Sequence, residues 1–344
     1  MPFLRIRTRR TRTRFAAVSV TAVLATGLLA ACGTSSGSDE ADAPAGAGFP
    51  VKIKNTFGTT EIKTKPEKIV TLGFNAQDVV YALGETPAGM PKYTYGANED
   101  GVMPWDEKYY DADKTKLITS TSDGKPAFEE IAALDPDVIL VPYEGFDEGT
   151  YKTLTKIAPT VAYPDQPWQT TWQDQTTIIG KALGKSKEAD ELVAETEDLV
   201  AKTAKAHPEF DGKTLSVGYF GSKLVNVYMP TDPRVQILNG LGFANSPGVQ
   251  KIAAKTDESK FFADLSWENV SDIDADVVVG YVDDLKVEEL PKSSDSLTAV
   301  KNDSALILDD TQVIAGLSQP TVLSVQWTLD RILDGLTRAA HNAS

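Results

Sequence analysis

Aromatic side chains gather where the predicted strands of this chain end, which is where ligand pockets form in α/β proteins. An aromatic wall with a few hydrogen-bond donors can hold an organic ligand without forming a bond to it. Because aromatic residues also dominate protein cores, we expect about half of the set to contact a ligand. The candidates are Phe74, Tyr93, Tyr95, Trp105, Tyr143, Trp168, Tyr219, Tyr228 and Tyr281, together with the donor Arg234.

The chain offers little for covalent catalysis or direct metal capture. Its two histidines are His207, beside a proline, and His341, in the C-terminal tail, so a Ser–His–Asp triad or a histidine metal site is not favoured. The acids Glu144 and Asp147 leave a carboxylate-based surface hydrolase open as an alternative. Acidic loops in a chain this acidic are usually solvated, however. We therefore expect no catalytic residue, no metal site and no cofactor.

The first 48 residues are typical of an export and anchoring segment. Six arginines and no acid precede an apolar run that ends at Cys32, the only cysteine in the sequence. This pattern predicts a secretory signal peptide, and the small residues before the cysteine resemble the bacterial lipobox. We expect residues 1–31 to be removed, Cys32 to carry a lipid, and residues 32–48 to form a flexible tether. The protein would then be held at the outer face of the cell membrane.

The charge of the chain argues against one class of partner. The full sequence has a net charge of −15, and removal of the six arginines in the signal segment lowers this to −21. A body this acidic is repelled by nucleic acid and by anionic lipid headgroups. A single cysteine allows no disulfide within one chain. We expect a monomer that does not bind nucleic acid.

Apolar periodicity predicts strands that alternate with helices, which indicates α/β layers. Two successive helices, at about 170–183 and 187–206, separate two such series. At 1.5 Å per residue the second helix is about 30 Å long, comparable with the diameter of a small lobe. We therefore predict two α/β lobes with central sheets, at residues 49–186 and 209–344, joined by a long helix over residues 187–208.

Several residues mark the expected helix ends. Asn75 and Ser266 stand where N-cap side chains accept from the first backbone N–H groups of a helix. Gly84 and Gly184 stand where helices are expected to stop. The last helix is expected from Gln319 to Ala339.

One segment of the first half recurs in the second half. Residues 128–140 and 267–279 align without a gap, and their aromatic and apolar positions coincide. Glu129 matches Glu268, and Asp137 matches Asp276. Each half therefore contains a helix–turn–strand unit with a glutamate in the first helical turn, as expected of two similar lobes. The helix dipole stabilises an acid there by a few tenths of a kcal/mol, which gives both glutamates a structural explanation as well.

Taken in order, these segments resemble the binding proteins that serve ABC importers of iron–siderophore complexes, haem and cobalamin. The resemblance covers about residues 57–336, and although each motif is weak, the ordered set is specific. It implies the fold of the class III periplasmic binding proteins, with two α/β lobes joined by one long rigid helix and the ligand between them. The matching motifs are residues 57–62 (FGTTEI), 66–70 (PEKIV), 129–140, 157–160 (IAPT), 179–184 (IGKALG), 265–268 (LSWE) and 273–276 (IDAD).

The resemblance also implies partners. In this family a glutamate on each lobe docks on arginines of the permease, and Glu129 and Glu268 occupy those positions here. The bound ligand would pass to the permease, and a separate ATPase would power its import. The implied partners are a ferric siderophore, an ABC permease with its ATPase, and the membrane through the lipid on Cys32.

Arginine usage narrows the choice of ligand. After Cys32 the chain has only Arg234, Arg331 and Arg338, and the last two lie on the predicted terminal helix. Arginine clusters suit the several negative charges of a ferric tris-catecholate or citrate complex. A single arginine near the cleft suits a neutral or cationic ferric hydroxamate of the ferrioxamine type. Haem and cobalamin remain open as ligands, and a surface interaction protein without a small-molecule ligand remains open as another class.

Overall fold

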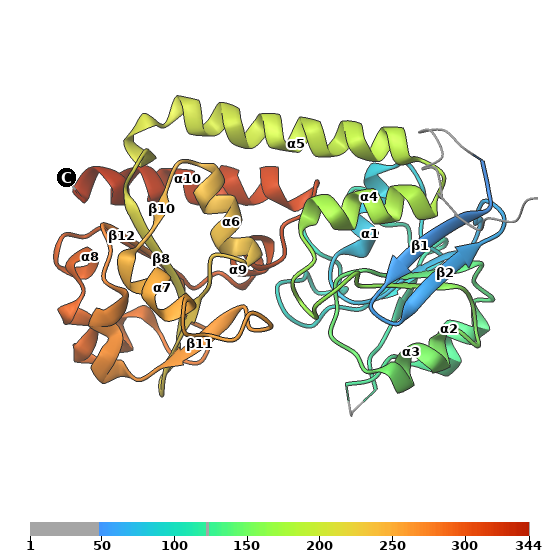
Figure 1. The fold of residues 1–344 in the computed structure, drawn as a ribbon, viewed down its shortest axis with the longest axis horizontal. Coiled ribbons are helices and arrows are strands. Elements are labelled where there is room, and N and C mark those ends of the chain that lie inside the picture. The colour runs from blue at the N-terminus through green and yellow to red at the C-terminus, as the bar shows by residue number, and fades with distance from the viewer. Residues whose placement is uncertain (1–47, 122–123, 344) are drawn as a thin grey trace, which may run out of the picture. The chain divides into compact units, whose positions relative to one another are not determined.

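A computed structural model describes residues 48–121 and 124–343 of the chain. The predicted signal segment, Cys32 and nearly all of the predicted tether lie outside these residues. Within the described residues, one lobe with a central sheet precedes the helix α5 (Ser186–Ala206) and another follows it. Figure 1 shows α5 running along both lobes. The α/β fold class expected from the sequence is confirmed.

The N-terminal lobe is built on a parallel sheet of five strands in the order β5-β4-β3-β6-β7. An antiparallel hairpin of β1 and β2 accompanies it. Every residue of β6 is buried, as expected for a parallel strand with both faces covered. The strands are β1 (Val51–Asn55), β2 (Gly58–Ile62), β3 (Ile69–Thr71), β4 (Gly89–Pro91), β5 (Lys116–Ile118), β6 (Val138–Val141) and β7 (Thr160–Ala162). The helices are α1 (Ala76–Ala82), α2 (Phe128–Ala133), α3 (Glu148–Leu154) and α4 (Trp172–Ala182).

The C-terminal lobe has a mixed sheet of six strands, in the order β11-β9-β8-β12-β13 with β10 beside β8. The strands are β8 (Thr214–Phe220), β9 (Val225–Tyr228), β10 (Ala244–Asn245), β11 (Phe262–Leu265), β12 (Val277–Tyr281) and β13 (Ala305–Leu308). The α-helices are α6 (Pro233–Gly240), α7 (Pro247–Ala253), α8 (Thr298–Lys301), α9 (Thr311–Ser318) and α10 (Ser324–Asn342). The 3-10 helices are η1 (Pro208–Phe210), η2 (Trp267–Ile273), η3 (Val287–Glu289) and η4 (Lys292–Ser296).

The two repeated segments occupy equivalent places in their lobes. The helix α2 leads into β6, and the helix η2 leads into β12, with each strand inside its sheet. Successive side chains of a strand point to opposite faces of the sheet. Accordingly Val138 and Ile139 belong to two different hydrophobic clusters, one on each face of the first sheet. Val277 and Val278 likewise belong to two different clusters in the second lobe.

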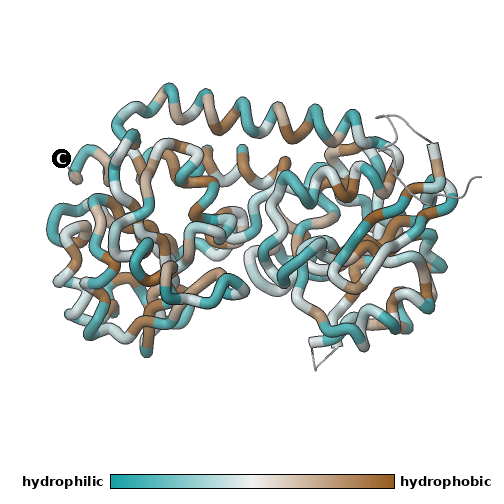
Figure 2. Tube along the Cα trace, viewed as in Figure 1, coloured by the Kyte–Doolittle hydropathy of each residue, from teal (hydrophilic) through white to brown (hydrophobic). Residues whose placement is uncertain are grey.

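The connecting helix α5 has a narrow apolar face. Ala189, Thr196 and Val200 are its buried residues. Apolar and polar residues alternate along its length in Figure 2, and lysine–acid pairs at (i, i+4) spacing lie on its exposed side. Pro208 follows its C-cap and cannot continue the helix. In residues 48–121 and 124–343, no helix is both long and apolar enough to cross a membrane.

Three sequence-based expectations about helix ends are wrong. The terminal helix begins at Ser324 rather than near Gln319, because Gln319 precedes a proline and the residue before proline is disfavoured in helical conformation. The Asn75 side chain does not cap α1, because Asn75 has a left-handed backbone (φ 58°) and its Nδ2 donates to the Gln319 carbonyl. The Ser266 hydroxyl accepts from Asn269 Nδ2 and forms no cap bond. The glycine stops were correct: Gly84 is left-handed (φ 76°) at the end of α1.

A second junction joins the lobes in addition to α5. We use this term for residues 315–324, which run from the second half of α9 to the first residue of α10, and the N-terminal residues they contact. The Thr321 hydroxyl donates to Asp78, and the Gln319 carbonyl accepts from Asn75. Ala315 packs in a cluster with Tyr93 and other buried residues of the first lobe. The lobes are therefore in contact at two places far apart in the sequence.

Candidate ligand-binding cleft

The strands of the N-terminal lobe end at a cavity of about 570 Å³, which we call the main cavity. Its walls come from the loops that follow β3, β4, β5 and β6, and from Ala315 and Gln319 of the second junction. The carboxyl ends of parallel strands meet at one edge of a sheet, which is where open α/β sheets bind ligands. Pockets for small organic ligands measure roughly 300–1,000 Å³, so the main cavity has a suitable size.

Three of the aromatic candidates, Phe74, Tyr93 and Tyr95, line the main cavity. The Tyr93 hydroxyl accepts from the Asn75 backbone N–H at 2.9 Å and donates to Gln77 Oε1 at 3.0 Å, which fixes the position of its ring. Tyr95 is 41% exposed and carries no such support. The Tyr93 side chain is therefore fixed by hydrogen bonds, whereas the exposed Tyr95 side chain is free to change its position when a ligand binds.

Trp168 and Tyr143 extend this aromatic wall. The ring centroid of Trp168 lies 5.6 Å from that of Phe74 and 5.9 Å from that of Tyr143. Trp168 has a left-handed backbone (φ 64°), which costs a bulky residue about 1–3 kcal/mol. Gly145 leaves room for it, because a Cβ there would lie 2.2 Å from Trp168 Nε1. The loop therefore holds Trp168 in a strained conformation against two candidate ligand contacts.

The C-terminal lobe brings four predicted site residues together. Tyr228 and Tyr281 stack at 11° with ring centroids 6.3 Å apart, and their hydroxyls share a hydrogen bond. The Arg234 guanidinium lies 3.5 Å from the centre of the Tyr228 ring, and its Nη1 lies 3.4 Å from the Tyr281 hydroxyl. The Tyr219 ring packs against Tyr281 at 5.3 Å. These residues form a second aromatic wall.

Asp232 balances the charge of Arg234 within this lobe. Nε and Nη2 of Arg234 donate to the two carboxylate oxygens of Asp232 at 2.8 and 2.7 Å. Burial lowers the pKa of Arg234, but the attraction of Asp232 outweighs it and raises the pKa overall, so the guanidinium stays charged. Both side chains are buried. The pair therefore contributes no net charge to the second aromatic wall.

Charged groups of the second lobe contribute to the pKa values of two tyrosines in the first lobe. Burial raises the pKa of Tyr143 in the first lobe, and the negative charge of Asp232 in the second lobe raises it further. Burial likewise raises the pKa of Tyr95 to about 12, with smaller contributions from Asp283 and Tyr281. Tyr143 also lines a small hollow together with the first residue of α6. Tyr143 of the first lobe and Pro233, which precedes Arg234, thus border the same small hollow, whereas none of Tyr219, Tyr228, Arg234 and Tyr281 lines the main cavity.

Trp105 does not line the main cavity, contrary to the expectation from the sequence. It is 4% exposed, its Nε1 donates to Asp78 Oδ2 at 2.7 Å, and its ring packs against Trp327 of α10 at 5.3 Å. Trp105 therefore belongs to the core beneath the cavity. Its own loop gives no signal of this burial, because the residue that covers it comes from the far end of the chain.

A pair of buried carboxyl groups beneath Tyr93 was missed in the sequence. Asp78 on α1 and Asp106 are fully buried, and Gln77 Nε2 donates to both at 2.9 Å. Burial raises the pKa of Asp106 to about 7, and burial together with the charge of Asp106 raises the pKa of Asp78 well above its ordinary value. Asp106 Oδ1 has no donor among the described residues. Burial therefore favours the protonated form of both carboxyl groups in the folded protein.

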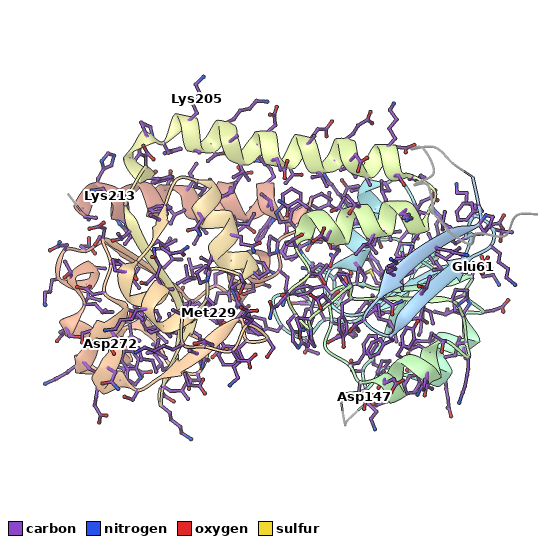
Figure 3. All side chains as sticks on the ribbon, in the orientation of Figure 1. Glu61, Asp147, Lys205, Lys213, Met229 and Asp272 are labelled. Carbon is purple, nitrogen blue, oxygen red and sulfur yellow. The ribbon has the colours of Figure 1, made fainter. Side chains whose placement is uncertain are left out.

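A second cavity, of about 510 Å³, lies between the lobes. Its walls include Met229, labelled in Figure 3, and the segments 165–169 and 256–260. Gln169 Nε2 donates to the Glu258 carbonyl there at 3.2 Å. None of the candidate aromatic residues, nor Arg234, lines this cavity. Nowhere in the described part of the chain do three His, Cys, Asp or Glu side chains group so as to hold a metal ion.

Glu129 and Glu268 lie in the first turns of α2 and η2, and both side chains are exposed. Neither forms a hydrogen bond or an ion pair through its side chain with another described residue. The carboxylates of Asp137 and Asp276, at the following strands, accept from donors that precede β3 and begin β8 respectively. The two glutamates are therefore equivalent in position and available to a partner.

Sequence comparison gives one family and several relatives. A profile of the periplasmic binding protein family matches residues 69–310. One similar protein is the probable siderophore-binding lipoprotein YfiY of Bacillus subtilis, which is 28% identical over 258 residues. That match covers 74% of this chain and 75% of the relative.

Solved structures of two binding proteins are similar to this chain. Streptococcus pneumoniae PiaA in complex with ferrichrome has a TM-score of 0.76 at 34% identity, over 85% of this chain and 99% of PiaA. Staphylococcus aureus SirA complexed with staphyloferrin B has a TM-score of 0.68 at 29% identity, over 83% of this chain and 98% of SirA. Both similarities extend across the two lobes and the helix between them.

Proposed function

The chain belongs to the periplasmic binding protein family, and from that premise we propose that it binds a ferric siderophore in the main cavity and passes it to an ABC importer. The family and the relatives are binding proteins rather than enzymes. The observation that carries the proposal is the main cavity of about 570 Å³, with its aromatic lining. The named siderophore ligands of PiaA and SirA support it.

The chemistry of the cleft suits a ligand that brings its own iron. The iron of a ferric siderophore is already fully ligated, so the protein needs no metal ligand. It needs aromatic surface and a few donors for the oxygens of the complex. Phe74, Tyr93 and Tyr95 supply the surface on one side. On the other side, the Tyr281 hydroxyl and the Arg234 guanidinium supply donors.

Among siderophores we propose a ferric hydroxamate. In the described part of the chain, Arg234 is the one arginine placed near the cleft, and Asp232 balances its charge. A ferric tris-catecholate or citrate complex carries several negative charges and suits a cluster of arginines. A ferric hydroxamate is neutral or cationic and needs only donors to its oxygens. The ferrichrome held by PiaA is a hydroxamate, which supports this choice.

Tryptophan fluorescence tests the ligand directly. The chain from Gly33 onward would be titrated with ferrioxamine B, a ferric catecholate, haem and cobalamin. We expect sub-micromolar quenching by the hydroxamate alone, and Trp168→Phe should remove most of the signal because Trp168 lies against Phe74. The matched control Trp267→Phe, in the core of the other lobe, should keep it. Preference for another ligand would replace the hydroxamate, and no response to any would contradict the small-molecule function.

We further propose that Glu129 and Glu268 dock on basic residues of the permease. Both are exposed and unpaired among the described residues, and they occupy equivalent positions on the two lobes. In cells that depend on this protein for iron, the double change Glu129→Gln and Glu268→Gln should abolish uptake and leave the siderophore Kd within about twofold. Glu130→Gln, next to Glu129 on α2, is the control and should leave uptake intact. Unchanged uptake in the double variant would remove the docking roles.

For the anchor, we propose that Cys32 carries a lipid that holds the protein, as a monomer, at the outer face of the cell membrane. The lipoprotein name of the Bacillus subtilis relative supports this. Cys32→Ala should move the protein from the membrane fraction to the soluble extracytoplasmic fraction. Membrane retention of that variant would contradict the lipid site, and a dimer in gel filtration of the chain from Gly33 would contradict the monomer.

A further inference from the structure

Glu144 places a carboxylate in the wall of the main cavity, three residues after β6. Its Oε1 accepts from the Gly145 backbone N–H at 2.9 Å, the one hydrogen bond its side chain forms within residues 48–121 and 124–343. No lysine or arginine of that part of the chain forms an ion pair with it. A partly buried carboxylate without a counter-charge is unfavourable, so it needs a cation or a proton from elsewhere.

Several contacts within the protein hold the loop around Glu144. The Glu144 carbonyl accepts from the Trp168 backbone N–H at 3.3 Å. The Tyr163 hydroxyl donates to the Phe146 carbonyl at 2.9 Å, and Gly145 packs against the Trp168 indole. Preorganisation of this kind lowers the cost of ordering a loop on binding. The carboxylate is therefore held as part of the cavity wall.

The other charged residues that line the main cavity differ from Glu144. Asp147, labelled in Figure 3, is committed to the fold, because its Oδ1 accepts from the Thr150 N–H at 2.7 Å and caps α3. Lys92 and Lys125 are exposed, and no ion pair joins either of them to Glu144. Burial raises the pKa of Glu144 and the Gly145 N–H lowers it, with no contribution from a cation. Glu144 is thus the cavity carboxylate left for a ligand.

We propose that Glu144 recognises a positively charged amino group on the siderophore and so selects cationic ferric hydroxamates over neutral ones. The inference rests on the proposed siderophore-binding function. An ammonium group supplies three donors and the positive charge that the carboxylate lacks. The opposite wall adds no competing charge, because Asp232 neutralises Arg234. Anionic complexes are disfavoured by repulsion from the same carboxylate.

Ferrioxamine B and its N-acetyl derivative form a matched pair of probes, because acetylation removes the ammonium charge and leaves the iron-binding groups unchanged. The Kd of each would be measured by fluorescence quenching for the chain from Gly33 onward. The wild type should bind ferrioxamine B about tenfold more tightly, as expected of one charge-assisted hydrogen bond. Glu144→Gln should reduce this preference to less than about twofold. Glu148→Gln, an exposed acid on α3 paired with Lys152, is the charge-matched control and should keep it.

Each outcome bears on the inference. Equal wild-type affinity for the two probes would overturn the role of Glu144 and leave the siderophore-binding function standing. An equal loss of preference in Glu144→Gln and Glu148→Gln would also overturn it, because the overall negative charge of the protein would then explain the preference. Failure of the wild type to bind either probe would overturn the hydroxamate function and this inference together.

Discussion

The two lobes contain the same helix–strand unit but bury carboxylates near the cleft in opposite ways. In the C-terminal lobe, Asp232 is paired with Arg234, and the pair stays charged. In the N-terminal lobe, Asp78 and Asp106 face one another without a cation and retain a proton. A buried carboxylate must be neutralised by one of these two means. The buried carboxylate of the second lobe is therefore neutralised by an arginine of the protein. The charge of the buried carboxyl pair in the first lobe depends on pH.

Removal of Asp232 should have the largest effect on stability. Asp232→Ala leaves the Arg234 guanidinium buried without its partner, and breaking a buried ion pair in this way costs about 3–5 kcal/mol. The free energy of unfolding, from urea titration, should fall by about that amount.

The control for this change is Asp310→Ala. Asp310 caps α9 through backbone N–H groups, as Asp232 caps α6, but it is exposed and has no buried cation beside it. Loss of a cap alone costs about 1 kcal/mol. If Asp232→Ala costs no more than Asp310→Ala, the ion pair does not carry the stability assigned to it.

The acid pair of the first lobe should make stability depend on pH. The folded pKa values of Asp78 and Asp106 are raised, to about 7 for Asp106, so the stability that their protons provide is complete below pH 4 and is lost as pH rises to about 7. Asp78→Asn keeps an acceptor for Trp105 and a donor for Asp106 without titrating. Relative to wild type, the variant should gain free energy of unfolding as pH rises from 5 to 7, because the wild type loses the contribution of the Asp78 proton over this range.

The same titration separates the two lobes. Asp232→Asn removes the partner of Arg234, whose guanidinium stays protonated throughout this range, so the stability deficit of the variant should be similar at pH 5 and pH 7. Urea midpoints at both pH values measure the two variants together. A constant difference between Asp78→Asn and wild type would show that the N-terminal pair does not hold a proton.

The repeated aspartates should have smaller and similar effects. Asp137 accepts from two backbone N–H groups ahead of β3, and Asp276 accepts from the N–H and hydroxyl of Thr214 at the start of β8. Replacing either with alanine should lower the free energy of unfolding by about 1 kcal/mol, with the larger loss at the less exposed Asp276.

Because the two aspartates lie in different lobes, the double variant should be additive within about 0.5 kcal/mol. Asp135→Asn, which removes the charge of a surface ion pair with Lys68 and suits the left-handed backbone at this position (φ 49°), is the control and should change stability by less than about 0.5 kcal/mol. A large difference between the losses in free energy of unfolding of Asp137→Ala and Asp276→Ala would contradict this prediction. It would mean that the two repeated segments are similar in sequence but that their aspartates have different structural roles.

The parts of the fold that depend on local pattern could be predicted from the sequence. Buried strands such as β6 and β12, the helix that separates the lobes and the repeat of residues 128–140 at 267–279 follow from apolar periodicity, and the structure contains them. Short strands such as β4 and β10 were not predicted. Residues at the ends of strands also come together as expected, with Tyr93 on one wall and Tyr228 on the other. Periodicity and strand order are sufficient for these statements.

The rest depends on contacts that no local pattern indicates. Trp105 and Asp78 are buried against each other because Thr321, 243 residues beyond Asp78, completes the same network. The available signal for Asp78 was an acid in a helix whose other residues, apart from Gln77, are apolar or aromatic. The sequence predicts Glu144 in a solvated loop. Its place in the cavity wall depends on the strained backbone of Trp168, whose N–H donates to the Glu144 carbonyl, and no local pattern indicates this contact.

The second junction has a thermodynamic consequence for ligand capture. Because Ala315 and Thr321 already pack against the first lobe, binding should bury little protein surface beyond the cleft itself. The change in heat capacity on binding is proportional to the apolar surface removed from water. Calorimetry should therefore give a small negative value that scales with the size of the siderophore. A much larger value, similar for every siderophore, would mean that the lobes separate widely before capture.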